Sequence, residues 1–352
     1  MNDIATLLKT FADAHGMSGY EDDVAALLLH EMEPLMDEVR IDTMGNAVGI
    51  RAGAGPSVMI AAHMDEIGAM ISHIEDSGFL RFVPVGGWYD ATILGQRVLI
   101  RTKEGKILPG VVGSRPPHVM DAEERKKTVK IKDMFIDCGA TSAQNAGELG
   151  VEIGSTVTID RELLPMGNDF VTGKALDNRA GVVMMVWALR LLKRKKVKAT
   201  IQAVGTVQEE VGLKGARTSA YDLTPDVAIA TDVTIPGDNP GVSRSESRVA
   251  AGAGPSITII DAAGRGVMSP PSVIRWLRET ADKAEIPYQL QVGNGGHTDA
   301  TAISITKSGI PCGVVTVPTR YIHSPVEVLS LRDLELGGKL IAAAIESVHR
   351  YF

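Results

Sequence analysis

Residues 201–234 read IQAVGTVQEEVGLKGARTSAYDLTPDVAIATDVT, and this stretch decides the fold. It contains two apolar runs rich in β-branched residues, Ile201–Val207 and Val227–Thr231, which predict two buried strands. Acids follow both runs: Glu209 and Glu210 after the first, and Asp232 after the second. In α/β proteins, ligands bind at the carboxyl ends of strands. The stretch therefore predicts a sheet whose strand ends can hold cations.

Length and composition describe an ordinary globular protein. The 352 residues are enough for two domains, and 44% of them are hydrophobic and 22% charged. A net charge of −7 gives no reason to expect a nucleic-acid partner. Cys138 and Cys312 lie far apart outside any C-x-x-C pattern, so we expect two reduced thiols. The N-terminal residues carry no signal-peptide pattern, and no apolar run approaches the ~20 residues of a membrane span. We therefore expect a cytoplasmic protein without a membrane partner.

Strand and helix patterns alternate in two separate parts of the chain. Apolar spacing predicts a helix over residues 3–15, and Ser18-Gly19-Tyr20-Glu21 has the pattern of a capping box that opens a second helix. Predicted strands follow at residues 39–50 and 57–62. The alternation resumes at Gly173 and continues to a C-terminal helix over 331–351. We expect an α/β fold with a mostly parallel, helix-covered sheet.

A segment with a different sequence pattern separates these two parts. Between residues 71 and 159, short β-type runs alternate with Gly- and Pro-rich turns, and a charged patch lies at Asp121–Asp133. This pattern predicts an inserted all-β domain, a small barrel. The discontinuous catalytic domain would then comprise residues 1–70 and 160–352. We expect His118 and the charged patch to belong to a solvated loop or a subunit contact.

The strand predicted at 57–62 leads directly into His63-Met64-Asp65-Glu66. Residues i and i+2 of a strand face the same side, so Asp65 can lie beside His63. A carboxylate that accepts a hydrogen bond from a metal-bound histidine fixes the orientation of its ring. A histidine and an acid exposed after a strand are the equally favoured alternative.

Five groups lie at predicted strand ends or helix starts, and all are histidines or carboxylates: His63, Asp177, the pair Glu209 and Glu210, Asp232, and His323. These ligand types suit zinc, cobalt or manganese. Two divalent ions carry four positive charges, and three carboxylates (Asp177, Glu210 and Asp232) leave one for a hydroxide. One carboxylate would bridge the ions, and one acid would remain as a general base. For Asp177, which precedes a predicted helix at 182–192, a simple helix N-cap is a serious alternative.

Five ordered motifs resemble the dinuclear metal aminopeptidases of the TET or glutamyl aminopeptidase type, and they span nearly the whole chain. They are HMDEIG (63–68), KALDNRAG (174–181), TVQEEVGLKGA (206–216), ATDVT (230–234) and PTRYIHSP (318–325). The resemblance implies two ions, zinc or cobalt, and peptide substrates with a free N-terminus. It implies that His63 and Asp232 bind one ion, that Glu210 and His323 bind the other, and that Asp177 bridges them. It also implies that Glu209 is the general base and that Asp65 orients His63.

The resemblance extends to the β-rich segment. KKTVKIKDMFIDCGATS (126–142) is similar to the family's version, and residues 71–159 match the family's oligomerisation domain. Family members often form tetrahedral dodecamers, so the resemblance implies self-association of this kind.

Two departures concern substrate choice. His297 interrupts a loop that is usually glycine-rich; it is either a pocket residue for the first substrate side chain or an exposed loop residue. The segment VAAGAGP (249–255) lacks the lysine that many relatives carry, which gives no support to a preference for acidic N-terminal residues.

Other functions remain open. The same ligands could serve a metal-dependent carboxypeptidase or an N-deacylase. A binding module with an inactive metal site is a further alternative, but retention of the non-ligand acid Glu209 argues against it. A glycosidase needs two carboxyls set apart across a sugar ring, and the ligand set gives no reason to propose one.

Overall fold

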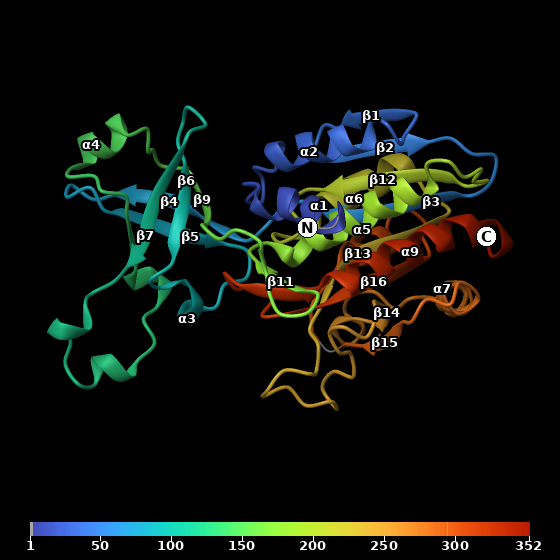
Figure 1. Cartoon of the computed structure of the whole chain (residues 1–352). Helices are drawn as coiled ribbons and strands as arrows, with labels where there is room; N and C mark the ends of the chain where they lie inside the picture. The colour runs from blue at the N-terminus through green and yellow to red at the C-terminus, as the bar shows by residue number, and fades with distance from the viewer. Residues whose placement is uncertain (1–2, 294) are drawn as a thin grey trace.

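The computed structural model describes residues 3–293 and 295–352. A large sheet covered by helices lies beside a smaller β-barrel (Figure 1). The main path of the sheet runs, in spatial order, through β1 (Glu38–Ile41), β2 (Ala47–Arg51), β12 (Thr200–Thr206), β3 (Ser57–His63), β13 (Val227–Thr234), β16 (Cys312–Arg320), β17 (Glu327–Ser330), β11 (Phe170–Gly173) and β10 (Leu164–Pro165). Off this path, β14 (Ser256–Ile260) pairs with β16 and with β15 (Gln289–Val292).

The prediction of a mostly parallel sheet is correct only for its centre. Strands β12, β3, β13 and β16 are parallel neighbours, but β1–β2, β2–β12, β16–β17, β17–β11 and β11–β10 pair antiparallel. Short connections produce the two outer hairpins, because two strands joined by a tight turn must run in opposite directions. The sheet is therefore mixed, with the parallel strands in the middle.

Helices cover both faces of the sheet. One face packs against α1 (Asp3–Asp13), α2 (Asp22–Met32), α5 (Leu176–Leu192), α7 (Pro271–Lys283) and α9 (Leu331–Ser347); the other packs against α6 (Lys214–Leu223) and α8 (Asp299–Ser304). Alternation along β3 explains the two cores: Val58 and Ile60 join the first, while Met59 and Ala61 join the second. A strand buried on both faces reads as a continuous apolar run, which is why β3 and β13 stand out in the sequence.

The β-rich segment forms a closed barrel, as predicted. Its strands in spatial order are β4 (Gly68–Ile74), β5 (Leu80–Val85), β8 (Phe135–Asp137), β7 (Ile107–Gly113), β6 (Arg97–Arg101) and β9 (Thr156–Ile159), which closes on β4. The segment is not purely β, because it includes the short helices α3 (Asp90–Ile93) and α4 (Ala143–Glu148). Its first strand begins at Gly68, before the expected boundary at residue 71.

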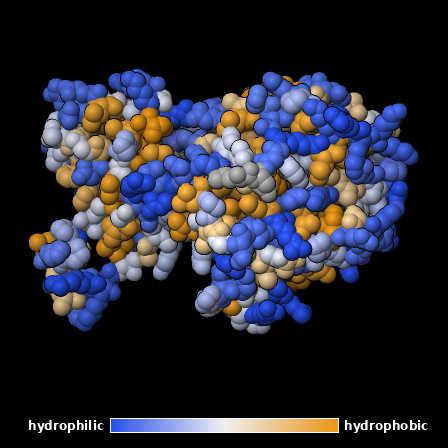
Figure 2. All heavy atoms as spheres, in the orientation of Figure 1, coloured by the Kyte–Doolittle hydropathy of each residue, from blue (hydrophilic) through white to orange (hydrophobic). Residues whose placement is uncertain are grey.

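The charged segment of the barrel is exposed in this single chain. Residues 115–133 form a long excursion below the barrel, with three short 3-10 turns at Pro117–Val119, Glu124–Lys126 and Ile131–Asp133 (Figure 1). Hydrophilic residues cover most of it, and His118 is exposed (Figure 2). Of the helices in the described ranges, none has the length and apolar character needed to cross a membrane.

A buried histidine joins the barrel to the N-terminal segment. His15 places Nε2 3.0 Å from Thr156 Oγ1 and Nδ1 2.9 Å from Thr158 Oγ1, both on β9. Burial lowers the pKa of His15 to about 4, and charges on Glu66, Lys174, Arg101 and Asp23 add smaller, opposing contributions. The folded protein therefore holds this imidazole neutral under conditions where the unfolded chain protonates it.

We expect His15 to make the fold less stable as pH falls below its unfolded pKa of about 6.5. The unfolded chain binds the extra proton between about pH 6.5 and 4, so unfolding becomes easier with acid across that window. Going from pH 7.5 to 5 should cost about 2 kcal/mol. Urea unfolding of metal-free protein at both pH values measures this, with His15→Gln as the matched variant. A pH dependence that is the same in both proteins would contradict the prediction.

Candidate metal centre

The predicted site residues meet at the carboxyl ends of the central strands. His63 is the last residue of β3 and pairs in register with Thr206, the last residue of the parallel strand β12. Glu209 and Glu210 follow in the turn after β12. Asp232 lies within β13 opposite Thr316 of β16, so the prediction that this strand ends at Thr231 is wrong, and the strand continues to Thr234. Parallel neighbours thus bring distant segments to one edge of the sheet.

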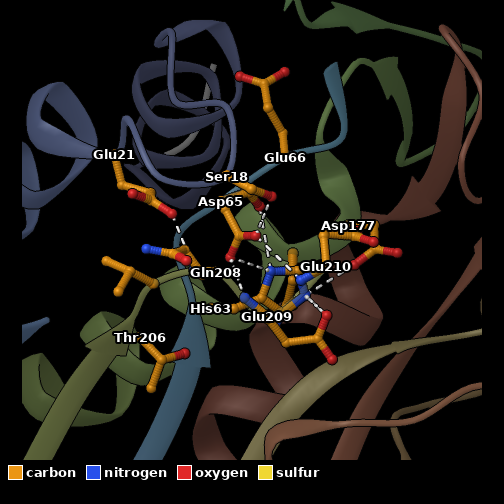
Figure 3. A network of polar contacts seen from close by, with 12 residues as sticks. Ser18, Glu21, His63, Asp65, Glu66, Asp177, Thr206, Gln208, Glu209 and Glu210 are labelled. Carbon is orange, nitrogen blue, oxygen red and sulfur yellow. Dashed lines mark hydrogen bonds and ion pairs between the residues drawn. The ribbon is translucent and has the colours of Figure 1, made fainter. Parts of the chain in front are cut away.

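His63 lies at the centre of the cluster and is buried. Its Nε2 is 3.2 Å from Asp177 Oδ1, 3.9 Å from Asp232 Oδ1 and 4.0 Å from Glu209 Oε2 (Figure 3). Its other nitrogen, Nδ1, is 3.4 Å from Asp65 Oδ1 and 3.2 Å from the main-chain oxygen of Asp65. One nitrogen therefore faces the acids while the other is engaged by Asp65.

Asp177 faces both histidines. Its Oδ1 contacts His63, and its Oδ2 is 3.3 Å from His323 Nε2. The same His323 nitrogen is 3.1 Å from Glu210 Oε1. The alternative of a plain helix N-cap is not supported, because Asn178 Oδ1 accepts the capping hydrogen bond from the backbone N–H of Gly181 at 2.8 Å, while both Asp177 oxygens face histidines. The peptide bond between Asp177 and Asn178 is cis.

Asp65 connects His63 to the turn that carries the two glutamates. Its carboxylate accepts hydrogen bonds from the backbone N–H of Glu209 at 3.0 Å and of Glu210 at 3.1 Å, and from Ser18 Oγ at 2.6 Å (Figure 3). Burial opposes its charge, but the hydrogen bonds and the charge of His63 prevail and lower the pKa of Asp65. Asp65 therefore fixes the His63 ring and the Glu209–Glu210 backbone together.

The capping-box prediction at Ser18–Glu21 is wrong, because neither side chain caps α2. Ser18 donates to Asp65, and the N-cap of α2 is Glu21, which makes no side-chain capping bond. Glu21 Oε1 instead accepts from the backbone N–H groups of Gly19 at 2.7 Å and Gln208 at 2.9 Å. The tertiary partners of these two side chains outcompete the local helix cap, and the segment supports the site.

The acids repel one another in a dry environment. Burial raises the pKa of Glu209 and that of Asp232 well above their usual values, and the carboxyl groups close by raise them further, although the charge of His63 opposes the effect. Burial also raises the pKa of Glu210. Concentrated carboxylates out of water are unfavourable unless cations compensate them.

The donor set fits such cations. Two groups of three can each place one ligand atom within 4.8 Å of the others: His63 with Asp177 and Glu210, and His63 with Glu209 and Asp232. His323 joins the first group through Asp177 and Glu210. Imidazole and carboxylate are the ligands that zinc and cobalt accept. These distances are compatible with Glu209 as a metal ligand and with Glu209 as a base that binds no metal.

A buried ion network supports the helix start that presents Asp177. Lys174 Nζ donates to Glu66 Oε1 at 2.8 Å, and Arg179 Nη2 lies 3.3 Å from the same oxygen. Both cations also donate to main-chain oxygens in the last turn of α1 and just after it, at Phe11, Ala14 and Gly16. The three charged side chains are buried, so removing Glu66 would leave two buried cations without the carboxylate that they share. These residues lie within the quoted motifs, but spacing alone gave them no role.

Sequence reasoning missed two further acids. Asp299 is buried at the start of α8, and its Oδ2 accepts from Thr206 Oγ1 at 2.5 Å. Glu327 is buried at the start of β17, beside Asp177 and His323. The sequence signal that could have revealed Glu327 is its position inside the otherwise apolar run Val326–Leu329. His297 is exposed, as either an open-pocket residue or a loop residue would be.

The barrel also reaches the site. Glu210, Asp177 and His323 line a pocket with about 280 Å³ of open space, whose other walls include Ile67, Trp88 and Ile159. Trp88 donates its indole N–H to Gly68 O at 2.7 Å, and Gly87 packs directly on His323.

Gly87→Val should therefore impair the site from the barrel side. A Cβ at Gly87 would lie 2.9 Å from His323 Nδ1, so the imidazole must move away from Asp177 and Glu210. We expect at least a roughly tenfold weaker hold on the metal at His323. Zinc titration measures this, and Gly147→Val is the control, since nothing lies within 4 Å of a Cβ there. Equal zinc affinity in both variants would refute the prediction.

The fold and the donor set define a protein with a cluster suited to divalent cations at the edge of a helix-covered sheet. The family model described as M42 glutamyl aminopeptidase matches residues 45–340, and the chain belongs to this family. A putative aminopeptidase of Acetivibrio thermocellus is 41% identical over 97% of this chain and 98% of its own. A lysyl aminopeptidase of Pyrococcus furiosus is 33% identical over 97% of this chain and 96% of its own.

Solved structures with a similar fold cover nearly the whole chain. An aminopeptidase from Desulfurococcus kamchatkensis has a TM-score of 0.93 and 46% identity, covering 97% of this chain and 94% of its own. A Pyrococcus horikoshii TET1 peptidase, described as assembling into a tetrahedron or a large octahedral shell, has a TM-score of 0.88 and 33% identity, covering 97% of this chain and 98% of its own. A Thermotoga maritima protein described as an endoglucanase has a TM-score of 0.79 and 30% identity over 97% of both chains.

Proposed function

We propose that the protein is a metal-dependent aminopeptidase that hydrolyses the first peptide bond of peptides with a free N-terminus. The observation that carries this proposal is the convergence of His63 and His323 on Asp177, with Glu209, Glu210 and Asp232 around them. The aminopeptidase relatives support the reaction class.

Two divalent ions, zinc or cobalt, would occupy the cluster. In this proposal His63 and Asp232 hold one ion, Glu210 and His323 hold the other, and Asp177 bridges them. Such a pair supplies Lewis-acid polarisation of the scissile carbonyl and lowers the pKa of water. The contacts of Asp177 with both histidines support the bridging role, since no other carboxylate of the described cluster is recorded within 4 Å of both.

Glu209 acts as the general base. It takes the proton of the attacking water and delivers it to the leaving amine, so one side chain serves both halves of the reaction. Its backbone N–H is held by Asp65, which also orients His63. The α-ammonium of the substrate is placed among the carboxylates of Glu209 and Asp232, which gives the site its requirement for a free N-terminus.

The barrel is the proposed oligomerisation domain, over residues 71–159, and residues 1–70 and 160–352 form the catalytic domain. Apolar side chains remain exposed on the barrel of the single chain, among them Val83, Ile107 and Val111. The shells formed by the TET1 peptidase support self-association into a tetrahedral dodecamer. Residues 249–255 contain no lysine, which gives no support to a preference for acidic N-terminal residues. A substrate whose first side chain is neutral or apolar is therefore as favoured as any other.

A panel of aminoacyl-p-nitroanilides, assayed after chelation and then with zinc or cobalt restored, tests the function and reports side-chain preference. We expect cleavage that depends on added metal and on a free amine. N-acetylated versions of the best substrate should resist cleavage, whereas an N-deacylase would remove the acetyl group. Release of the C-terminal residue from a blocked peptide would indicate a carboxypeptidase, and hydrolysis of soluble cellulose would indicate an endoglucanase. Metal binding without hydrolysis of any of these substrates would indicate a binding module.

A further inference from the structure

Glu327 occupies an unusual position for a buried acid. It is 2% exposed, and among the described residues no lysine or arginine forms an ion pair with it. Both carboxylate oxygens accept backbone hydrogen bonds: Oε2 from Asp177 N at 2.8 Å and Oε1 from His323 N at 3.0 Å. One side chain therefore holds the main chain of two residues that are far apart in sequence.

Those two residues need an external support. Asp177 has non-helical φ and ψ inside the helical span of α5, and His323 has a φ of +60°, in the left-handed region that non-glycine residues seldom adopt. Asp177 lies in the first turn of α5, where N–H groups have no intrahelical partner, and His323 lies between β16 and β17. The Glu327 carboxylate therefore takes the place of a secondary-structure partner. It also sets the spacing of the two backbones, whose side chains meet at Asp177 Oδ2 and His323 Nε2, 3.3 Å apart.

Nearby cations would favour the charged form of Glu327. A buried carboxylate is costly unless it is paired or lies close to metal. The two hydrogen bonds use both oxygens as acceptors, a demand that a glutamine cannot meet, because its amide nitrogen is a donor. If this position required only packing, an apolar side chain of similar volume would stabilise the fold more than a buried acid does.

We propose that Glu327 is a positioning residue of the metal centre, fixing Asp177 and His323 at the separation that two ions require. This inference rests on the metal binding in the proposed function, and not on the peptidase reaction. Glu327 acts through the backbone of the two ligand residues, so it shapes metal affinity without binding the substrate. Outer partners of metal ligands typically contribute 10- to 100-fold in affinity, and we expect an effect of that size here.

The structure supplies a matched control. Asp333 is another buried acid whose two oxygens accept backbone N–H groups, from Gly252 at 2.6 Å and Gly254 at 2.7 Å, on a loop that bears none of the proposed ligands. Asp333→Asn removes the same kind of hydrogen bond as Glu327→Gln. Loss of a backbone bond to a buried acid should destabilise both variants, but only Glu327→Gln should affect the metals.

The experiment measures zinc stoichiometry and dissociation constants by competition with a chromophoric chelator, without peptide. We expect Glu327→Gln to bind the weaker ion about 10- to 100-fold less tightly, and Asp333→Asn to stay within about threefold of the wild type. With zinc in excess, peptide KM should remain within about twofold for Glu327→Gln while kcat falls.

Three results would overturn the inference. They are wild-type zinc affinity in Glu327→Gln, an equal loss in Asp333→Asn, and a Glu327→Gln defect confined to KM. If Glu327→Gln does not fold in chelator, Glu327→Asp, which keeps the charge but is one methylene shorter, replaces it with the same expected weakening. A wild-type protein that binds zinc without cleaving peptides would contradict the proposed function and leave this inference standing.

Discussion

Glu209→Gln is expected to lower kcat by about 10²- to 10⁴-fold while both ions remain bound, because the amide keeps the shape of the side chain but cannot accept the proton of water. The backbone at Glu209 is fixed independently of its side chain, through its hydrogen bond to Asp65. The substitution should therefore leave the turn, His63 and the other acids in place. Steady-state kinetics with the best p-nitroanilide and metal analysis of the same samples measure the two effects.

The control for Glu209 is a neighbouring buried acid without a proposed chemical role. Glu21 is such a residue, since its carboxylate accepts backbone hydrogen bonds from Gly19 and Gln208 beside the site. Glu21→Gln should cost far less turnover than Glu209→Gln. A Glu209→Gln enzyme with wild-type kcat would remove Glu209 from the mechanism. Loss of an ion in that variant would instead make Glu209 a ligand, as its 4.0 Å distance from His63 allows.

The centre of the sheet could be predicted from sequence because each of its signals is local. Strands β3 and β13 are buried on both faces and begin as apolar runs, and acids break the pattern abruptly after β3 and inside β13. The edges could not be predicted as well. Strands such as β10, with two residues, and β17, with four, are too short to show a period, so their antiparallel pairing emerges only in the fold.

The site residues differ in the same way: those beside strong local patterns could be predicted, and those that act through distant partners could not. His63, Asp177, Glu210, Asp232 and His323 are ligand-type residues next to strong strand or helix patterns, and these segments were found from their own sequence. Glu327 and Ser18 act through partners 150 and 47 residues away in the chain, and no periodicity encodes such a pairing. The capping-box pattern at Ser18 even pointed to a local role that its tertiary partner replaced.

Asp177→Asn is expected to break up the metal pair. Its carboxylate faces His63 with one oxygen and His323 with the other, so the amide leaves one imidazole opposite an N–H donor and removes a charge from between the ions. We expect at most one ion per chain after dialysis and at least a roughly 10³-fold loss of turnover, since the attacking water and the carbonyl lose the pair that activates them. Elemental analysis and kinetics give both numbers.

The same substitution separates metal binding from folding, because a metal stabilises only the state that binds it. At zinc concentrations about 100-fold above the dissociation constant, the wild type should gain about 2.7 kcal/mol per site and melt at a higher temperature than in chelator. Asp177→Asn should lose most of that gain. In chelator it should also melt lower than the wild type, because His63 and His323 prevail over burial and hold the pKa of the Asp177 carboxyl well below its usual value in the metal-free fold. Asp333→Asn is the control, with a lower melting temperature but a full response to zinc. An Asp177→Asn protein that keeps two ions and the full zinc response would show that another residue bridges the pair, or that the ions do not share a ligand.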